Sequence, residues 1–177
     1  MKIIKTVMTS AVAMALVSFC ANAANQGQSV VNFKGSVINA PCGIAPESAD
    51  QSIDFGQISK AHLEASGISV KKNLDIKLVN CDVGELANTG SVKVSFTGTT
   101  INGQVKELGT AGDTGAAVVI SEASGNLVSF DGTAGAATKL QEGDNTLRYS
   151  TWVKKATNGA LKEGDFTAVA NFNLTYE

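Results

Sequence analysis

The chain has 177 residues, a net charge of −2, 44% hydrophobic residues, three cysteines and a single histidine, His62. The length suits one domain, the charge excludes a basic nucleic-acid binder and a polybasic membrane binder, and the apolar content excludes a disordered chain. One histidine leaves little material for a transition-metal site or a histidine-dependent catalytic centre, so the composition favours a small structural or binding domain.

The first 23 residues are predicted to be a secretory signal peptide. Lys2 and Lys5 precede a short apolar stretch over residues 11–17, and residues 21–23 read Ala-Asn-Ala, an A-x-A cleavage site. The apolar stretch is too short for a membrane span. Cleavage would leave 177 − 23 = 154 residues with a net charge of −2 − 2 = −4, because both lysines leave with the signal. We expect the mature chain to be soluble or assembled outside the inner membrane.

Two cysteines, Cys42 and Cys81, would remain after cleavage. Cys20 leaves with the signal, and a lipoprotein signal is disfavoured there because the bulky Phe19 precedes it. In an exported protein an even pair of cysteines predicts a disulfide. The pair lies 81 − 42 = 39 positions apart, a loop for which chain entropy gives a stabilisation of about 4 kcal/mol.

The rest of the chain is typical of an all-β protein, because apolar and polar residues alternate between turns rich in Gly, Asn and Asp. In chain order, strands are expected at residues 29–37, 53–55, 74–78, 92–96, 116–121, 126–130, 147–153 and 166–176. Asn102-Gly103 predicts a tight turn, residues 59–66 a short helix, and residues 109–115 and 132–137 surface loops. Many short strands separated by turns favour a β-sandwich.

Both ends of the mature chain are unusual for an ordinary sandwich. Residues 29–37 alternate like a strand, although a free N-terminal tail is normally disordered. The last expected strand is apolar on one face and ends with the chain, so its edge would need a covering strand. The pattern suggests a domain that lacks one strand and borrows it from a neighbour's tail by β-strand addition. An ordinary seven-stranded sandwich with frayed ends is the alternative.

The residues resemble the pilin subunits of chaperone–usher fimbriae, and among these most closely the major rod subunits of P pili. The matching stretches are residues 31–42, 48–57, 78–82 and 168–176, which with their spacing cover nearly the whole mature chain. The specific features are the Phe33-x-Gly35 strand before the first cysteine, the cysteine pair, Gly164 at the fourteenth position from the end, and the penultimate Tyr176. These features are specific only in combination.

The resemblance implies an incomplete immunoglobulin-like β-sandwich that lacks its last strand and is completed by donor-strand exchange. Residues 24–36 would form the donor-strand extension and residues 37–177 the incomplete domain. The inserted face of the extension would be Gly27, Ser29, Val31, Phe33 and Gly35, with no room for a side chain at Gly35. The groove and chaperone-contact strand would carry Gly164, Phe166, Ala168, Ala170, Phe172, Leu174 and Tyr176.

The resemblance also implies the partners and the destination. A periplasmic chaperone would fill the groove, and at an outer-membrane usher the extension of the next subunit would replace it. The product would be a homopolymer in a surface fimbria, joined to adjoining minor pilins. No enzyme activity, cofactor, metal or nucleic acid is expected. The major rod pilin is the first hypothesis; a minor pilin (tip adaptor or terminating anchor) and a secreted carbohydrate-binding sandwich or enzyme are the alternatives.

Other sequence features carry no chemistry that would favour an enzyme. The glycines at 109, 112 and 115 lack the Lys-Ser/Thr that follows a phosphate-binding loop. Asp50, Asp54 and Glu64 are scattered and predict no acid–base pair. Trp152 lies on the polar face of its expected strand, as a contact between turns of a rod or as a partly covered side chain. Residues 71–72 and 154–155 are lysine pairs, interpreted as solvated.

Overall fold

The structure, a computed structural model, describes residues 29–85, 90–101 and 103–177. It divides into two units, Met1–Val37 and Ile38–Glu177. The predicted signal peptide, the donor residue Gly27 and the turn residue Asn102 lie outside the described residues. On either side of that turn the strands pair Ile101 with Gln104, and Gly103 has a φ of 73°, as a tight turn requires.

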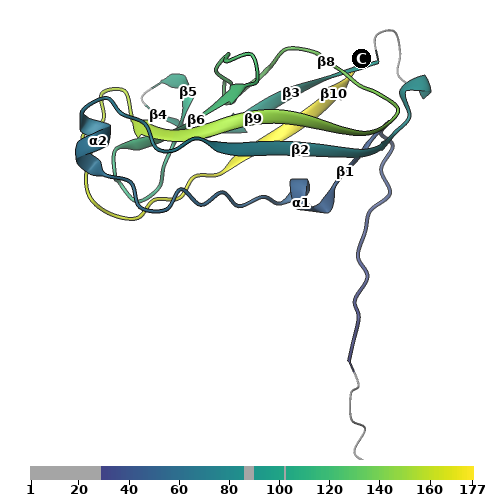
Figure 1. Cartoon of the computed structure of the whole chain (residues 1–177), viewed down its shortest axis with the longest axis horizontal. Helices are drawn as coiled ribbons and strands as arrows, with labels where there is room; N and C mark the ends of the chain where they lie inside the picture. Colours follow the sequence, from purple (N-terminus) through teal and green to yellow (C-terminus); the bar gives the residue numbers. More distant parts are fainter. Residues whose placement is uncertain (1–28, 86–89, 102) are drawn as a thin grey trace, which may run out of the picture. The chain divides into compact units, whose positions relative to one another are not determined.

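The unit from residue 38 onward contains two antiparallel sheets. One has the order β1-β2-β9-β6-β5-β4 and the other the order β10-β3-β7, with β8 also paired to β3. In that order the first sheet consists of β1 (Gly43–Ile44), β2 (Lys72–Cys81), β9 (Gly143–Lys155), β6 (Ala116–Glu122), β5 (Gln104–Gly109) and β4 (Thr100–Ile101). The second consists of β10 (Ala170–Tyr176), β3 (Ser91–Gly98), β7 (Asp131–Ala134) and β8 (Thr138–Lys139). Figure 1 shows the long strands β2 and β9 side by side.

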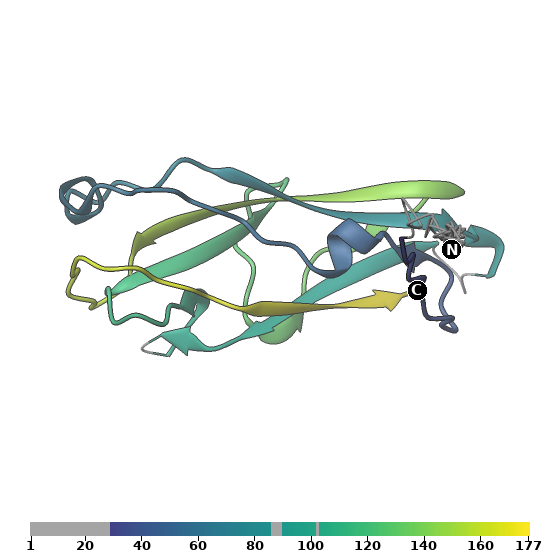
Figure 2. The same cartoon turned by 90° about the horizontal axis from the view of Figure 1, so that it is seen from below.

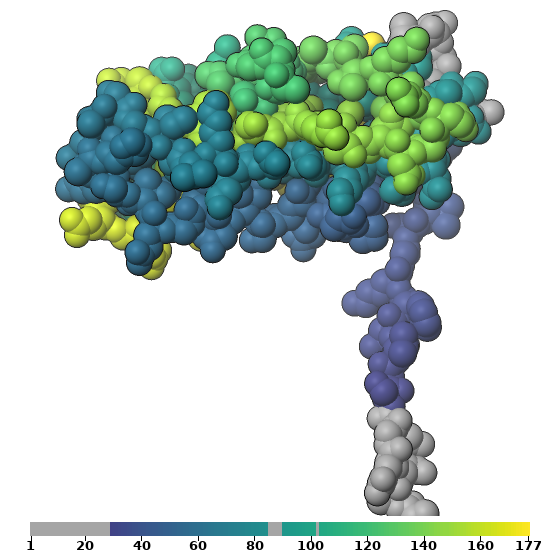
Figure 3. All heavy atoms as spheres, in the orientation of Figure 1, coloured from purple at the N-terminus to yellow at the C-terminus, as the bar shows by residue number. Residues whose placement is uncertain are grey.

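The core is formed by the apolar faces of the two sheets. Its buried side chains include Ile76 and Leu78 of β2, Leu147 and Val153 of β9, and Val92, Val94 and Phe96 of β3. The strands expected at 74–78, 92–96, 116–121 and 147–153 are therefore confirmed as β2, β3, β6 and β9. Each long apolar side chain removed from water contributes about 1.5–3 kcal/mol. Figure 3 shows the face of β2 (teal) and β9 (lime green) that points away from the core, where their side chains form a continuous surface.

The disulfide between Cys42 and Cys81 is confirmed, with an S–S distance of 2.12 Å and a Cα–Cα distance of 4.1 Å. Both cysteines are buried. The bond holds the start of the domain against the end of β2, next to the pairing of Gly43 with Val79 and a hydrogen bond from the Asp82 N–H to the Pro41 carbonyl.

The expected helix at 59–66 is confirmed as α2 (Lys60–Glu64). Ser59 caps it, because its Oγ accepts a hydrogen bond from the His62 N–H at 3.3 Å, and Leu63 is buried in the core. The exposed His62 ring lies 3.1 Å from the Ile68 carbonyl through Nε2. Two shorter helices were not expected, α1 (Pro46–Ala49) and the 3₁₀ turn η1 (Val83–Glu85).

The prediction of a strand at residues 126–130 is wrong, and the loop expected at 132–137 is confirmed only for residues 135–137, because residues 132–134 belong to β7. The backbone there changes sheets: the Val128 N–H donates to Ile120 of β6, the Phe130 N–H to Val105 of β5, and the Phe130 carbonyl accepts from Gly98 of β3. Only after this crossing does the chain pair with β3, as β7, with a register shift between Ser95 and Thr97. A segment whose hydrogen bonds go to three different strands forms no ladder of its own.

Three other expected strands are also absent or shorter than predicted. Residues 29–37 and residues 53–55 form no strand within the described chain. The last strand begins at Ala170 instead of residue 166, and before it only an isolated bridge joins Thr167 to Ala111. Residues 29–37, 53–55 and 166–169 all carry the alternation of a strand. Within the described chain, none of the three has a neighbouring strand with which it pairs regularly.

Candidate functional site

The C-terminal strand β10 is an edge strand that pairs on one side only, with β3. Its register is regular from Ala170 opposite Gly98 to Tyr176 opposite Val92. No other strand of the described chain lies along its second side. An edge of this kind presents a row of backbone donors and acceptors that another strand can use.

The hydrogen bonds at the end of β10 show which residues face that free side. Ser91 and Glu177 exchange two backbone hydrogen bonds, of 3.0 and 2.8 Å. In an antiparallel ladder, hydrogen-bonded pairs alternate with pairs that exchange none. The even-numbered residues of β10 fall in the second class in this register, so their N–H and C=O groups point away from β3; these are Ala170, Phe172, Leu174 and Tyr176.

The side chains of the same even-numbered residues turn toward the core. They are half-buried and pack against it, whereas Asn171, Asn173 and Thr175 are exposed. The Phe172 ring lies 6.3 Å from that of Phe96, centroid to centroid, and Phe96 meets Tyr149 edge to face at 5.2 Å. Burial raises the pKa of the Tyr176 hydroxyl, which therefore stays protonated. β10 thus offers apolar side chains and free backbone groups along the same edge.

The segment that follows α1, residues 50–59, belongs to neither sheet and lies across from this edge. It is held at its start because the buried Ser48 Oγ accepts from the Lys77 N–H at 2.9 Å, and the Gln51 side chain donates to the Asp75 carbonyl at 3.0 Å. Between residues 52 and 58 no backbone hydrogen bond reaches a neighbouring strand of the described chain. The edge of β10 and residues 50–59 are therefore the two borders of one site, and the second border, like the first, has backbone groups available for pairing.

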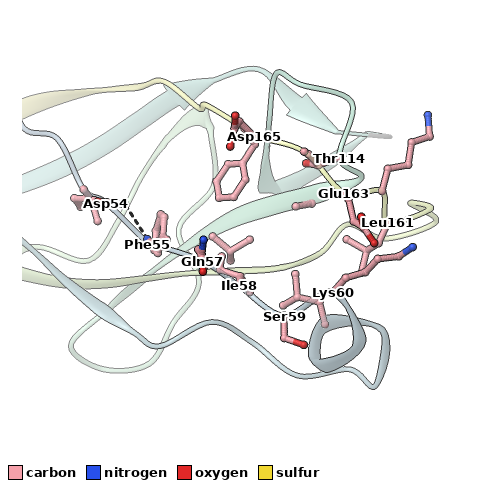
Figure 4. A pocket seen from close by; sticks show the side chains of 18 residues that line it. Asp54, Phe55, Gln57, Ile58, Ser59, Lys60, Thr114, Leu161, Glu163 and Asp165 are labelled. Carbon is pink, nitrogen blue, oxygen red and sulfur yellow. Dashed lines mark hydrogen bonds between the residues drawn. The ribbon is translucent and has the colours of Figure 1, made fainter.

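A groove lies between the two borders and consists of two adjoining cavities. The first, of ≈ 680 Å³, extends along residues 166–172, and the second, of ≈ 840 Å³, along residues 161–166 toward α2. Figure 2 shows the two borders running along the length of the domain. Apolar core residues floor the first cavity: Leu74, Phe96, Leu108, Val118 and Ile120. In Figure 4, Phe55, Ile58 and Leu161 surround the second cavity from both borders.

Two aromatic side chains meet across the groove where the cavities adjoin. Phe55, from the border after α1, and Phe166, from the chain leading into β10, have ring centroids 6.5 Å apart with planes tilted by 33°. Both rings are half-buried and line both cavities. The two rings therefore bridge the groove at the place where the two cavities adjoin.

The residues expected on the groove strand have the following places in the structure. Phe166 lines both cavities, Gly164 the larger one, and Ala168, Ala170 and Phe172 the smaller one. Gly164 has a φ of 148°, which favours glycine. Leu174 and Tyr176 continue the same face of β10 without lining either cavity.

The second border was missed as part of the site. Its side chains include Ile53, Phe55 and Ile58. The alternation of Ile53 and Phe55 was available in the sequence, but it predicted a paired strand and not the wall of a groove.

The expected donor residues are exposed in this chain. Val31 is 70% and Phe33 91% exposed, and Ser29 and Gly35 are also exposed. Large apolar side chains at such exposure are costly in water, so an alternating exposed segment of this kind indicates an interaction site.

The described residues contain no group of three or more His, Cys, Asp or Glu side chains that could hold a metal ion. Among them there is also no helix long and apolar enough to cross a membrane. Trp152 is half-buried and lies under Lys71, whose Nζ is 4.6 Å from the ring centroid, so the partly covered interpretation agrees with the structure.

The fold and the groove together define an all-β, immunoglobulin-like sandwich that lacks one strand. The family described as fimbrial protein matches residues 31–177, and the chain belongs to this family. It is 52% identical over 185 residues to the Pap fimbrial major pilin protein of Escherichia coli, covering 98% of this chain and 100% of the relative. It is 40% identical over 179 residues to the fimbria A protein of Serratia marcescens, with full coverage of both chains.

Solved structures agree with this assignment. The crystal structure of the P pilus rod subunit PapA matches with a TM-score of 0.73 and 51% identity, covering 78% of this chain and 100% of that one. A chaperone–usher pilus structure matches with a TM-score of 0.80 and 52% identity, covering 86% and 97%. These relatives are structural pilin subunits, a non-enzymatic class, so the fold class and the expectation that the chain is no enzyme are confirmed.

Proposed function

We propose that the chain is the major rod subunit of a surface fimbria and that its copies join by donor-strand exchange. In this proposal the tail of one copy inserts into the groove of the next, with Gly27, Ser29, Val31, Phe33 and Gly35 facing inward. The observation that carries it is the open edge of β10 beside an apolar groove, in a chain that also exposes an alternating apolar tail.

The physics of the two segments supports their pairing. A strand in the groove would receive the backbone groups that β10 turns away from β3, which is β-strand addition. Val31 and Phe33 would leave water, each contributing about 1.5–3 kcal/mol. Packing and backbone pairing supply the driving force, so assembly needs no nucleotide.

A chaperone and an usher would complete this scheme. The groove of a newly exported subunit is an apolar surface that would self-associate, so a periplasmic chaperone strand covering β10 up to Tyr176 would keep it separate. An outer-membrane usher would then allow the tail of the next copy to replace that strand. Adjoining minor pilins would use the same tail-and-groove geometry at the ends of the rod.

The experiment compares two tail variants of equal charge change in bacteria that express the full chain with its assembly proteins. V31D/F33D places two charges on the inserted face and should abolish fibres. N32D/K34N makes the same change of −2 on the opposite face and should leave them intact. Electron microscopy and the yield of surface polymer report the result. Normal fibres from V31D/F33D would overturn the proposal, and a thin fibre in place of a helical rod would assign the chain to a minor pilin.

A further inference from the structure

Beyond the end of β1, the edge of β2 is paired by side chains instead of by a strand. β1 ends at Ile44, and the Ala45 N–H still donates to the Lys77 carbonyl at 3.0 Å. A continuing antiparallel ladder would return this bond, from the Lys77 N–H to the Ala45 carbonyl. That carbonyl instead accepts from the N–H groups of Ser48 and Ala49 in α1, at 2.8 and 3.1 Å. The Lys77 N–H therefore needs a partner other than a strand backbone.

The side chain of Ser48 is that partner. Its Oγ accepts from the Lys77 N–H at 2.9 Å and donates to the Asp75 carbonyl at 3.3 Å, and Ser48 is only 2% exposed. The Gln51 side chain donates to the same Asp75 carbonyl at 3.0 Å. Pro46, at the start of α1, has no N–H with which to continue the ladder. Because a hydroxyl both donates and accepts, one buried oxygen serves the two backbone groups that a neighbouring strand would serve.

This replacement of a strand by side chains changes where the chain goes next. In the register of β1, a continued strand would place Ile53 opposite Ser69 and Phe55 opposite Gly67, along the segment that leads into β2. The chain instead turns out of the sheet at α1, and Figure 1 shows it running from α1 to α2 as a separate segment. Ile53 and Phe55 consequently line the groove.

We infer that Ser48 and Gln51 are positioning residues for donor-strand exchange: they take the place of a strand partner for β2 and so hold residues 50–59 as the second border of the groove. The inference rests on the proposed function, since it assumes that a tail enters between the two borders. Between residues 52 and 58 the border has no backbone hydrogen bond to a neighbouring strand of the described chain, so its position depends on the anchor at its start. A border that is already in place lowers the ordering cost of binding the incoming strand.

Ser69 provides a matched control, because it makes the same kind of bond outside the border. Its Oγ accepts from the Val153 N–H at 2.9 Å and donates to the Val70 carbonyl at 3.2 Å, and Ser69 is 7% exposed. Its side chain lines neither cavity. Replacing Ser48 or Ser69 by alanine removes the partner of one buried backbone N–H, so both variants should lose a similar amount of global stability. Only S48A should also release the border.

The test measures the uptake of a donor strand by the full chain carrying V31D/F33D, in which the tail itself is disabled. The probe is a fluorescein-labelled peptide of residues 27–38, and fluorescence anisotropy gives its Kd. S48A should weaken binding about tenfold, and Q51M, which keeps the length of the side chain but cannot donate, should weaken it severalfold. S69A should keep the Kd within about twofold of the parent, although urea unfolding should show a loss of stability similar to that of S48A.

Equal weakening of peptide binding by S48A and S69A would show that affinity follows global stability, and would overturn the inference. Peptide binding as tight as that of the parent in both S48A and Q51M would overturn it too, while leaving donor-strand exchange intact. If S48A does not fold, Q51M decides the question, because Gln51 is only partly buried. A parent chain that does not bind the peptide at all would contradict the proposed function itself.

Discussion

Lys154 Nζ lies 2.6 Å from Glu107 Oε1, and Glu107 is only 5% exposed. The same carboxylate accepts hydrogen bonds from the Thr157 N–H at 2.8 Å and from its hydroxyl. Lys154 was expected to be solvated, which is wrong because the sheet places β5 within its reach across the small side chain of Ala117. The cluster ties β5 to the end of β9.

This cluster should make the stability of the subunit acid-sensitive. Burial works to raise the pKa of Glu107, but the hydrogen bonds from Lys154 and Thr157 outweigh it and hold the pKa below its usual value. The stabilisation is therefore complete above the ordinary glutamate pKa of about 4.3 and is lost as the pH falls through the lowered value. E107Q should lower the free energy of unfolding by about 1–3 kcal/mol at pH 7 and should make it change less between pH 7 and pH 3. Urea unfolding at the two pH values measures both effects.

The control for this prediction is the exposed ion pair between Lys162 and Asp113, whose carboxylate is 87% exposed. D113N should leave the unfolding free energy unchanged at pH 7, because exposed pairs contribute little. If E107Q and D113N lowered the unfolding free energy equally, burial would have no special role in the Glu107 cluster.

The sequence predicted the strands whose partners and core contacts lie within the chain. β2, β3 and β9 alternate because one face is buried, and β6 is apolar from Ala116 to Ile120 because both of its faces are covered there. Residues 126–130 could not be placed, since their hydrogen bonds go to β6, β5 and β3. Which strand receives each bond is a long-range property that no local pattern encodes.

Sequence alternation pointed to only one of the two borders of the groove. Alternation from Phe166 to Tyr176 identified the apolar edge of the C-terminal strand, although the regular ladder starts only at Ala170. The opposite border at Ile53 and Phe55 has the same alternation, but it faces a groove instead of a neighbouring strand. Sequence alternation shows that a segment is suited to pairing; it does not show whether the partner is in the same chain.

Hydrogen exchange should reveal the free edge of β10. In the monomeric variant V31D/F33D the amides of Phe172 and Leu174, which point away from β3, should exchange quickly, whereas those of Asn173 and Thr175, which face β3, should be protected. In the assembled polymer all four should be protected, because the inserted strand supplies acceptors. NMR of the exchanged and dissolved samples resolves single amides. Equal protection of the two classes in the monomer would contradict the deduced direction of these groups.

The disulfide should stabilise the border of the groove as well as the fold. The 39-position loop that it closes predicts a loss of about 4 kcal/mol in the double variant C42S/C81S. Because Cys42 leads directly into β1 and α1, hydrogen exchange should rise most in residues 43–51. Urea unfolding of oxidised subunit, of reduced subunit and of the double variant measures the effect. Oxidised and reduced subunits that unfold at the same urea concentration would show that the bond adds no stability.

The end of β10 should decide how well the proposed chaperone captures the subunit. Tyr176 is half-buried on the face that lines the edge, and Glu177 is held by backbone bonds to Ser91 and by a 2.7 Å ion pair with Lys93. Deleting residues 176–177 should sharply reduce co-purification of the chaperone from periplasmic extracts, because the strand edge is shortened and an apolar contact is lost. K93Q, which removes the ion pair and keeps the tyrosine, should retain capture. The amount of chaperone captured by Y176A should lie between the amounts captured by the deletion variant and by K93Q. Full capture by the deletion variant would show that the chaperone does not depend on this end of β10.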